Sequence, residues 1–249
     1  MDQITGSIDD DDDPKNDSFT KETFQNNIYV MSPKRIKDAK RRSLDGNITL
    51  RFPPEPSGYL HLGHAKAIFI NFETANFHEG KCLLRYDDTN PRNAKIEYYD
   101  GINDMIEWLG YEPSQITYAS DNFQILYEKA VELINCKNAY VCHQKQERGK
   151  HKSESPYQYR TVEENLLHFD KMKEGEYVEE EAVLRIKLKS SGILDPVIYR
   201  IIDVPHCRTK NKWKIYPTYG FAHCICDSLE GIAVSLCTEE FSDHKLLYN

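Results

Sequence analysis

Apolar positions between residues 47 and 119 alternate between short continuous runs and runs with helical spacing. An apolar run over residues 48–52 is stopped by Pro53, and a second run covers residues 82–86, which predicts two buried strands. Positions with helical spacing follow each run: Ala65, Ile68 or Phe69, Phe72 and Ala75, then Tyr99, Ile102, Ile106 and Leu109 before Gly110. This strand–helix–strand–helix order predicts the start of a doubly wound, Rossmann-like α/β sheet, whose ligands bind beyond the carboxyl ends of the strands.

The pattern changes near residue 120. A helix is expected over residues 123–134, and another after Thr161, where Glu164 completes a capping box. A half-buried strand with a basic outer face is indicated by the alternation of Leu184, Ile186 and Leu188 with Arg185, Lys187 and Lys189. After Pro217 we expect a helix through Leu229 and a strand over residues 232–236.

These patterns predict four parts. Residues 1–46 have few periodic apolar positions and are expected to be a disordered tail. Residues 47–119 are the first half of the Rossmann-like domain, residues 120–214 an inserted α+β region, and residues 215–249 a second, incomplete part of the Rossmann-like domain.

The tail begins with an acidic part and ends with a basic part. The net charge of the chain is −8, and an acidic run, Asp9 to Asp13, lies in the tail. Residues 34–51 instead carry seven bases and two acids. A solvated segment and a contact with nucleic-acid phosphates both fit this basic cluster, and composition does not decide between them.

Bulk composition excludes several classes of protein. With 39% hydrophobic and 11% aromatic residues the chain can bury a core, so wholesale disorder is excluded. No apolar run approaches the length of a membrane span, and the N-terminus lacks a secretory pattern. The seven cysteines have no paired spacing, which favours buried thiols in a reducing, cytoplasmic compartment without a metal site.

The segment from Arg51 to His64 carries the strongest chemical signal. It predicts a strand, a rigid proline turn, and two histidines that flank Gly63 at a helix N-terminus. Helix N-termini attract phosphate, glycine permits close approach of the backbone to a nucleotide, and His61 and His64 can donate hydrogen bonds to a triphosphate. A histidine pair around a glycine alone would also fit an ordinary packed helix start.

The whole segment, Arg-Phe-Pro-Pro-Glu-Pro-Ser-Gly-Tyr-Leu-His-Leu-Gly-His, resembles the first signature of class I aminoacyl-tRNA synthetases, with Leu62 in place of isoleucine. The prefix narrows the resemblance to the glutaminyl and eukaryotic-type glutamyl branch, and the likeness extends from Asn47 to Tyr248. It implies a ligase of protein biosynthesis that uses ATP, with Mg²⁺, to form an aminoacyl-adenylate and then charges the terminal adenosine of tRNA. By resemblance the catalytic residues are His61, His64 and Glu55, and Glu55 alternatively caps the adjacent loop. The ATP-binding residues implied are Pro54, Glu55, Pro56, His61, Gly63, His64 and Lys66.

Two further motifs concern the amino acid. The stretch Leu84 to Pro91 is similar to the family's Leu-Arg-Phe-Asp-Asp-Thr-Asn-Pro, in which the position of Asp87 binds the substrate α-ammonium. Asp88 and Asn90 are expected to form an Asx-type turn into Pro91. The stretch from Tyr216 resembles the family motif whose second tyrosine, here Tyr219, lies against the substrate side chain.

Cys237 favours glutamine as the substrate. It lies in Ser-Leu-Cys-Thr-Glu-Glu-Phe, which resembles the glutaminyl motif, whereas glutamyl enzymes have an arginine there to pair with the substrate carboxylate. An unpaired carboxylate in a tight pocket costs several kcal/mol, on the order of a thousandfold. Arg51, which by resemblance lies near the same substrate side chain, partly offsets this preference.

The resemblance also implies the partners. The inserted region corresponds to an acceptor-stem-binding domain, in which Arg160 would meet phosphates. We therefore expect a monomer that binds L-glutamine, ATP and the acceptor end of tRNA(Gln), and no membrane.

The sequence departs from the family at three places. Gly220 replaces an aspartate, and Ala233-Val234 replace a Thr-His pair, which removes polar groups near the expected amino-acid pocket. The second signature, Lys-Met-Ser-Lys-Ser, and the anticodon-binding barrel would follow Asn249, so the chain is expected to be a C-terminally truncated catalytic region with weak substrate binding. The alternatives are a glutamyl enzyme, a short relative that glutamylates another acceptor, and an inactive synthetase-like protein that binds RNA or a protein partner.

Overall fold

The computed structural model describes residues 4–6, 29–144, 155–187 and 195–238. The chain forms two compact units. Unit 1 comprises Met1–Asp87, Ile96–Tyr118 and His223–Asn249, and unit 2 comprises Asp88–Lys95 and Ala119–Ala222. Unit 1 is therefore assembled from three separate chain segments.

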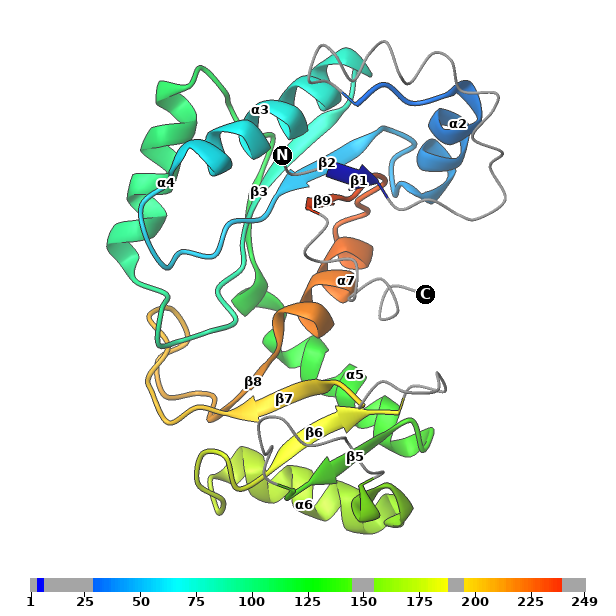
Figure 1. Cartoon of the computed structure of the whole chain (residues 1–249), viewed down its shortest axis with the longest axis vertical. Helices are drawn as coiled ribbons and strands as arrows, with labels where there is room; N and C mark the ends of the chain where they lie inside the picture. The colour runs from blue at the N-terminus through cyan, green and yellow to red at the C-terminus, as the bar shows by residue number, and fades with distance from the viewer. Residues whose placement is uncertain (1–3, 7–28, 145–154, 188–194, 239–249) are drawn as a thin grey trace. The chain divides into compact units, whose positions relative to one another are not determined.

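A three-stranded parallel sheet is the centre of unit 1. Its strands are β2 (Thr49–Phe52), β3 (Lys81–Tyr86) and β4 (Ile116–Tyr118), in the order β2-β3-β4. Helices α3 (Leu62–Phe77) and α4 (Ile96–Trp108) make the crossovers that parallel strands require (Figure 1). This confirms the parallel α/β sheet predicted from the apolar runs.

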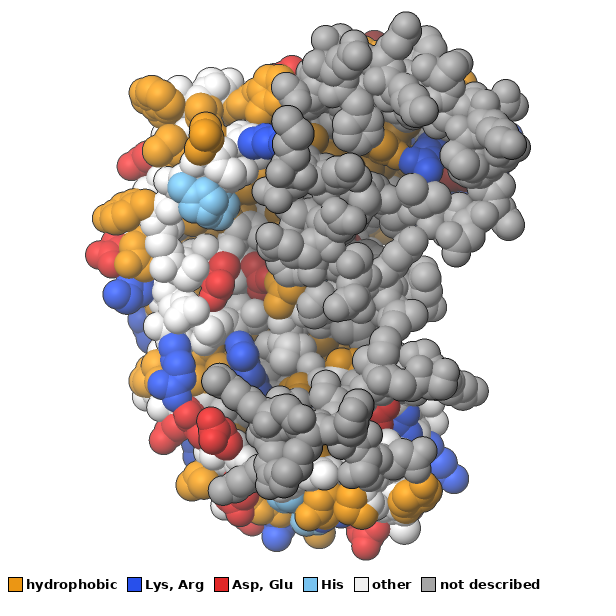
Figure 2. All heavy atoms as spheres, viewed as in Figure 1, with side chains coloured by type: hydrophobic (Ala, Val, Ile, Leu, Met, Phe, Trp, Pro, Cys, Tyr) orange, Lys and Arg blue, Asp and Glu red, His pale blue; other side chains and the backbone are white. Residues whose placement is uncertain are grey.

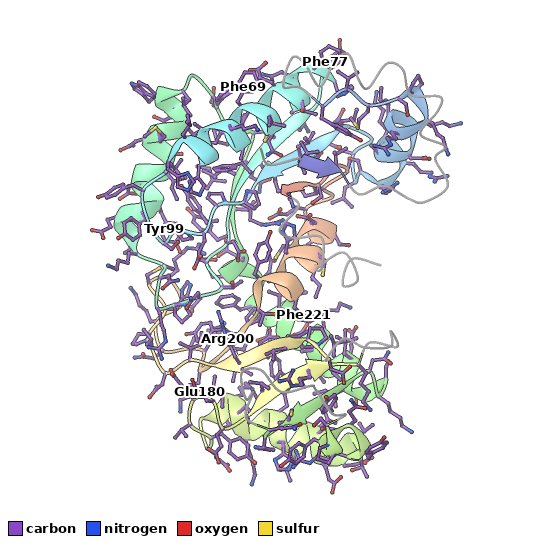
Figure 3. The ribbon with its side chains drawn as sticks, in the orientation of Figure 1. Phe69, Phe77, Tyr99, Glu180, Arg200 and Phe221 are labelled. Atoms are coloured by element: carbon purple, nitrogen blue, oxygen red, sulfur yellow. The ribbon has the colours of Figure 1, made fainter. Side chains whose placement is uncertain are left out.

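Helix α3 presents an apolar side to the core. Ile68, Phe72 and Ala75 are buried, whereas Phe69 remains 37% exposed, so Ile68 rather than Phe69 is the inward residue. Phe69 and Phe77 project from the outer side of the helix (Figure 3). Figure 2 shows hydrophobic side chains on the surface of this part of unit 1, where Trp108 of α4 is also exposed.

The expected disordered tail contains two ordered elements. Helix α2 (Pro33–Arg42) begins with Ser32, whose Oγ accepts a hydrogen bond from Arg35 N at 3.4 Å, and with proline in the first turn. Strand β1 (Ile4–Gly6) pairs antiparallel with β9 (Leu236–Thr238). The prediction of disorder was wrong for α2, because a capped turn and a few buried residues suffice to hold a short helix.

The predicted strand over residues 232–236 is mostly irregular. Strand β9 begins only at Leu236, because the amides of Ala233 and Val234 both donate to one carbonyl, Thr49 O, at 2.9 and 3.2 Å. Two donors on one acceptor cannot continue a regular ladder.

Unit 2 contains a four-stranded antiparallel sheet. Its strands are β5 (Ala139–Cys142), β6 (Val183–Ile186), β7 (Val197–Ile201) and β8 (Ile215–Pro217), in that order. The helical elements are η2 (Ala119–Asn122), α5 (Phe123–Asn135), η3 (Pro156–Tyr159) and α6 (Val162–Glu174). The capping box of Thr161 and Glu164 at the start of α6 is as predicted. Phe221 packs edge-to-face against Tyr199, with ring centroids 5.8 Å apart.

The basic outer face predicted for β6 was wrong at Arg185. This side chain is buried, and its Nη1 donates to Asp195 O at 2.6 Å. The buried backbone carbonyl of Asp195 thus supplies the partner that a buried guanidinium needs. Leu188 and Lys189 lie outside the described residues.

Helix α7 (Tyr219–Leu229) begins in unit 2 and ends in unit 1, and it confirms the helix predicted after Pro217. Among the described residues, no helix combines the length and apolar character that a membrane crossing requires.

Candidate active site

The loops that follow β2 and β3 are tied together at the carboxyl edge of the sheet. Asp87, directly after β3, donates its backbone N–H to Pro54 O at 2.9 Å. Parallel strands bring successive loops to one edge, which is where α/β sheets bind ligands. The loop of the first signature, after β2, and Asp87 of the second motif, after β3, thus lie at the same edge of unit 1.

His61 and His64 form a pair at the start of α3. His61 is the N-cap, and its Nδ1 accepts from Gly63 N at 3.1 Å. The Nδ1 of His64 accepts in turn from His61 N at 3.2 Å, and the two ring centroids are 4.0 Å apart. Backbone amides therefore fix both rings through the same ring atom.

This geometry determines which atoms remain for a ligand. A neutral imidazole whose Nδ1 accepts a hydrogen bond carries its proton on Nε2. Burial, and then the nearby His61, hold the pKa of His64 below its usual range, which favours this neutral form. Each histidine thus retains an Nε2–H donor, as a triphosphate site requires.

Gly63 is required for a reason the sequence did not reveal. A Cβ at this position would lie 2.9 Å from His61 Cε1 and 3.1 Å from His61 Nδ1. The missing side chain makes room for the capping ring, and the close approach of the backbone to a nucleotide stays a prediction. The Gly63 amide itself is engaged by His61.

The remaining expected nucleotide-binding residues differ in exposure. Pro54 and Pro56 are buried and fix the course of the loop, while Glu55 and Lys66 are exposed. Glu55 O also accepts from Ser57 N at 2.9 Å. The structure places these side chains on the segment that leads into α3 and on its first turns.

The neighbouring residues Asp87 and Asp88 are both buried, but they belong to different units. Asp88 was expected in an Asx-type turn, yet its carboxylate accepts from Ser120 N at 2.8 Å and from Ser120 Oγ at 2.6 Å. That prediction was wrong for Asp88, since a distant partner outcompetes the local turn. It was right for Asn90, whose Oδ1 accepts from Arg92 N at 3.2 Å.

Arg51 lies in a buried ionic network. It is fully buried, and its Nε donates to Asp227 Oδ1 at 3.0 Å. One Nη donates to Leu236 O at 3.2 Å, and the other lies 2.6 Å from His223 Nε2. The expected place of Arg51 near the substrate side chain stays a prediction, and the structure shows in addition that Arg51 binds the carbonyl of Leu236, the residue before Cys237.

Arg85 completes this network from β3. Its guanidinium lies 2.7 Å from both Asp227 Oδ1 and Glu230 Oε2. Burial alone would lower the pKa of Arg85, but Asp227 and Glu230 outweigh burial and raise it, so the side chain stays charged. Arg85 Nη2 also lies 2.9 Å from His223 Nδ1. A neutral imidazole has one acceptor nitrogen, so only one of the two arginines can donate to His223 at a time.

Sequence reasoning missed this network although signals were present. Arg85 lies within an apolar strand, where a charge requires a partner. His223 and Asp227 lie on one face of α7 at i and i+4, and Glu230, at i+7, directly follows the last residue of this helix.

The other predicted site residues lie in unit 2 or near the end of the described chain. In unit 2, Tyr219 begins α7, and Arg160 is held over the Tyr157 ring at 4.4 Å and donates to Val141 O at 3.2 Å. Gly220 is buried. The backbone of Cys237 pairs with Thr5 in β1–β9, and its side chain lies outside the described part of the chain.

Comparison with known proteins identifies the family of the chain. The family described as "tRNA synthetases class I (E and Q), catalytic domain" matches residues 47–249. A "Probable glutamine--tRNA ligase" of Caenorhabditis elegans is 49% identical over 91% of this chain and 30% of its own length. A "Glutamine--tRNA ligase" of Buchnera aphidicola (strain APS) is 48% identical over 92% of this chain and 42% of its own length. The chain thus spans less than half the length of these relatives.

A solved structure has the same fold at lower identity. The glutamate tRNA ligase of Elizabethkingia meningosepticum is 20% identical, with a TM-score of 0.57 over 81% of this chain and 46% of that structure. The parallel sheet, the histidine pair at the start of α3 and the match over residues 47–249 lead to one assignment. The chain belongs to the class I tRNA synthetases of the glutamyl and glutaminyl type, and it carries residues of their catalytic domain.

Proposed function

We propose that this chain is the ATP- and amino-acid-binding part of a glutamine–tRNA ligase. The observation that carries the proposal is the histidine pair, in which His61 and His64 are both fixed through Nδ1 and both retain Nε2–H. In the proposed reaction a carboxylate oxygen of glutamine attacks the α-phosphorus of ATP, and the bond to pyrophosphate breaks. The two Nε2–H donors stabilise the negative charge that develops on the phosphate oxygens.

Asp87, Tyr219 and Cys237 are proposed to bind the amino acid. Asp87 lies at the carboxyl edge of the sheet, where its carboxylate suits an α-ammonium group. Cys237 offers no positive charge to a substrate carboxylate, which supports glutamine over glutamate. The identity to glutamine–tRNA ligases supports the same choice.

Arg51 is proposed to act on the pocket through the backbone. Its hydrogen bond to Leu236 O holds the residue next to Cys237, while Asp227 neutralises its charge. The positive charge of Arg51 would otherwise favour glutamate. Because this charge is already paired with Asp227, Arg51 does not weaken the preference for glutamine.

Unit 2 is proposed to bind the acceptor end of tRNA(Gln), with Arg160 near phosphates. The stacking of Arg160 on Tyr157 limits the conformational freedom that binding would otherwise cost. For Mg²⁺, the described residues contain no group of three His, Cys, Asp or Glu side chains able to hold an ion. We therefore propose that Mg²⁺ binds to the phosphates of the nucleotide.

ATP–pyrophosphate exchange tests the proposal. The chain is assayed with glutamine and with glutamate, in the presence of tRNA. Exchange with glutamine is expected, and the double variant H61A/H64A should abolish it without unfolding the chain. Exchange with glutamate alone would identify a glutamyl enzyme. A folded chain that exchanges with neither would contradict the proposal and favour an inactive RNA- or partner-binding protein.

A further inference from the structure

Helix α2 carries a dense positive charge. Its ten residues include six bases and one acid, Asp38, within a chain whose net charge is −8. The bases are Lys34, Arg35, Lys37, Lys40, Arg41 and Arg42. Three of them lie in the last turn, where they interact favourably with the negative end of the helix dipole. The other three are too far from that end for the dipole to stabilise them.

The helix is fixed to unit 1 through its other side. Ala39 is buried, and so are Val30 and Met31, which precede the helix. Met31 N donates to His78 Nε2 at 3.1 Å, and Tyr29 N donates to Thr74 Oγ1 at 3.2 Å, so α3 holds the entry to α2. The basic side chains are therefore carried on an ordered scaffold.

Five of the charges face outward, and three of these have no acidic partner among the described residues. Lys34, Lys37, Lys40, Arg41 and Arg42 are exposed. The helical repeat places Lys34, Lys37 and Arg41 opposite Ala39, with Lys40 and Arg42 flanking the buried side. Arg41 pairs with Asp38 at 3.2 Å while its side chain remains 79% exposed. Within the described part of the chain, Lys37, Lys40 and Arg42 have no acidic partner. We call the surface of Lys34, Lys37, Lys40, Arg41 and Arg42 the α2 basic face.

We propose that the α2 basic face binds the phosphate backbone of RNA, as a second contact of this chain with its tRNA. Lys37, Lys40 and Arg42, which have no acidic partner among the described residues, are spaced along an ordered helix and match a polyanion, whose condensed counterions are released on binding. A membrane surface would also require exposed apolar side chains on this face, and Ala39 points inward. The inference rests on the proposed function only in naming tRNA as the RNA.

The α2 basic face is separate from the candidate active site. Residues 43–48 connect α2 to the start of β2, so α2 lies at the N-terminal end of that strand (Figure 1). His61, His64 and Asp87 lie at the carboxyl edge. Charge reversal on α2 should therefore leave the activation site intact.

Fluorescence anisotropy with a labelled tRNA transcript tests the inference. The variant K37E/K40E/R42E should bind at least tenfold more weakly than the parent chain at low salt. If each of the three side chains meets one phosphate, the slope of log K against log salt should fall by about 2–3. Unchanged affinity and slope would show that the face is only solvated and would overturn the proposal.

A charge-conserving variant is the control. K37R/K40R/R42K keeps every charge of the three positions and should bind as the parent does. A loss of affinity in this variant as large as that of K37E/K40E/R42E would show that side-chain shape, and not charge, carries the contact, and it would overturn binding to a phosphate backbone.

Glutamine-dependent ATP–pyrophosphate exchange, measured on the same samples, separates the two proposals. If K37E/K40E/R42E loses RNA binding but no variant supports exchange, the α2 contact stands and the proposed function fails. If exchange persists at saturating tRNA while RNA affinity does not change, the proposed function stands and the α2 contact fails.

Discussion

His61 connects the fold of α3 to its proposed chemistry. The Nδ1 atom caps the helix, and the same hydrogen bond leaves Nε2–H as a donor. A histidine in this position therefore does what serine or aspartate does at other helix starts, and it also presents a proton to the ligand side. Gly63 is part of this arrangement, because a side chain there would displace the ring.

Gly63→Ala should lower glutamine-dependent exchange by about 10–100-fold, since the loss of one aligned donor costs up to a few kcal/mol of transition-state stabilisation. Urea unfolding should change little, because the higher helix propensity of alanine offsets the loss of the His61 cap. Gly58→Ala is the matched control, since its Cβ would meet nothing within 4 Å and full activity is expected. Normal exchange in Gly63→Ala would show that the position of His61 is not critical.

Asp227 is the common partner of two buried arginines. Asp227→Asn keeps the shape but leaves two cations sharing less negative charge, so the free energy of unfolding should fall by about 3–5 kcal/mol. Urea unfolding measures it. Glu132→Gln, at the exposed pair of Lys129 and Glu132, should cost less than about 1 kcal/mol. Similar losses in both variants would contradict a buried network.

At the scale of elements, His78 holds the entry to α2. Its Nε2 accepts from Met31 N, which requires the neutral ring, and burial holds the pKa of His78 below its usual range. A lowered folded pKa means that the unfolded chain binds the proton more readily. The contact should thus stabilise the fold fully above about pH 6.5 and be lost as the pH falls through the lowered pKa.

Hydrogen exchange at the Met31 amide can follow this contact. Protection should be high at pH 7.5 and fall several-fold more than that of core amides at pH 5.5, once intrinsic exchange rates are corrected. His78→Ala should show low protection at both values. Equal corrected protection at both values in the parent chain would rule out His78 as the pH-sensitive contact.

The elements that the sequence predicted well are those with strong periodicity and local signals. The apolar runs and the Thr161–Glu164 capping box identified β2, β3, α3, α4, α5, α6 and α7. Arg185 and Asp88 were misassigned because their partners, Asp195 O and Ser120, lie 10 and 32 positions away. The histidine pair was visible in the sequence, whereas the Arg51–Arg85 network required the return of α7 to unit 1. Long-range pairing of charges has no periodic signature.

At the scale of the whole molecule, unit 1 depends on its last segment. Arg51 and Arg85 lie in the first part of the unit, and both acids that neutralise them follow residue 222. A chain that ends at Ala222 should therefore lose protease resistance over residues 47–87 and keep it over residues 119–144. A chain that ends at Thr238 is the control and should resist cleavage in both regions. Equal resistance in both chains would mean that the early segments fold without Asp227 and Glu230.

The separation of the arginines from their acidic partners also delays the folding of unit 1 during synthesis on the ribosome. Arg85 and Glu230 are 145 positions apart, so at about 5–20 residues per second the acid is synthesised roughly 7–30 s after the arginine. During that interval the nascent strands β2 and β3 carry two arginines that cannot be buried at low cost. We expect these strands to stay accessible to chaperones until α7 emerges from the exit tunnel, although they are among the first core elements to be made.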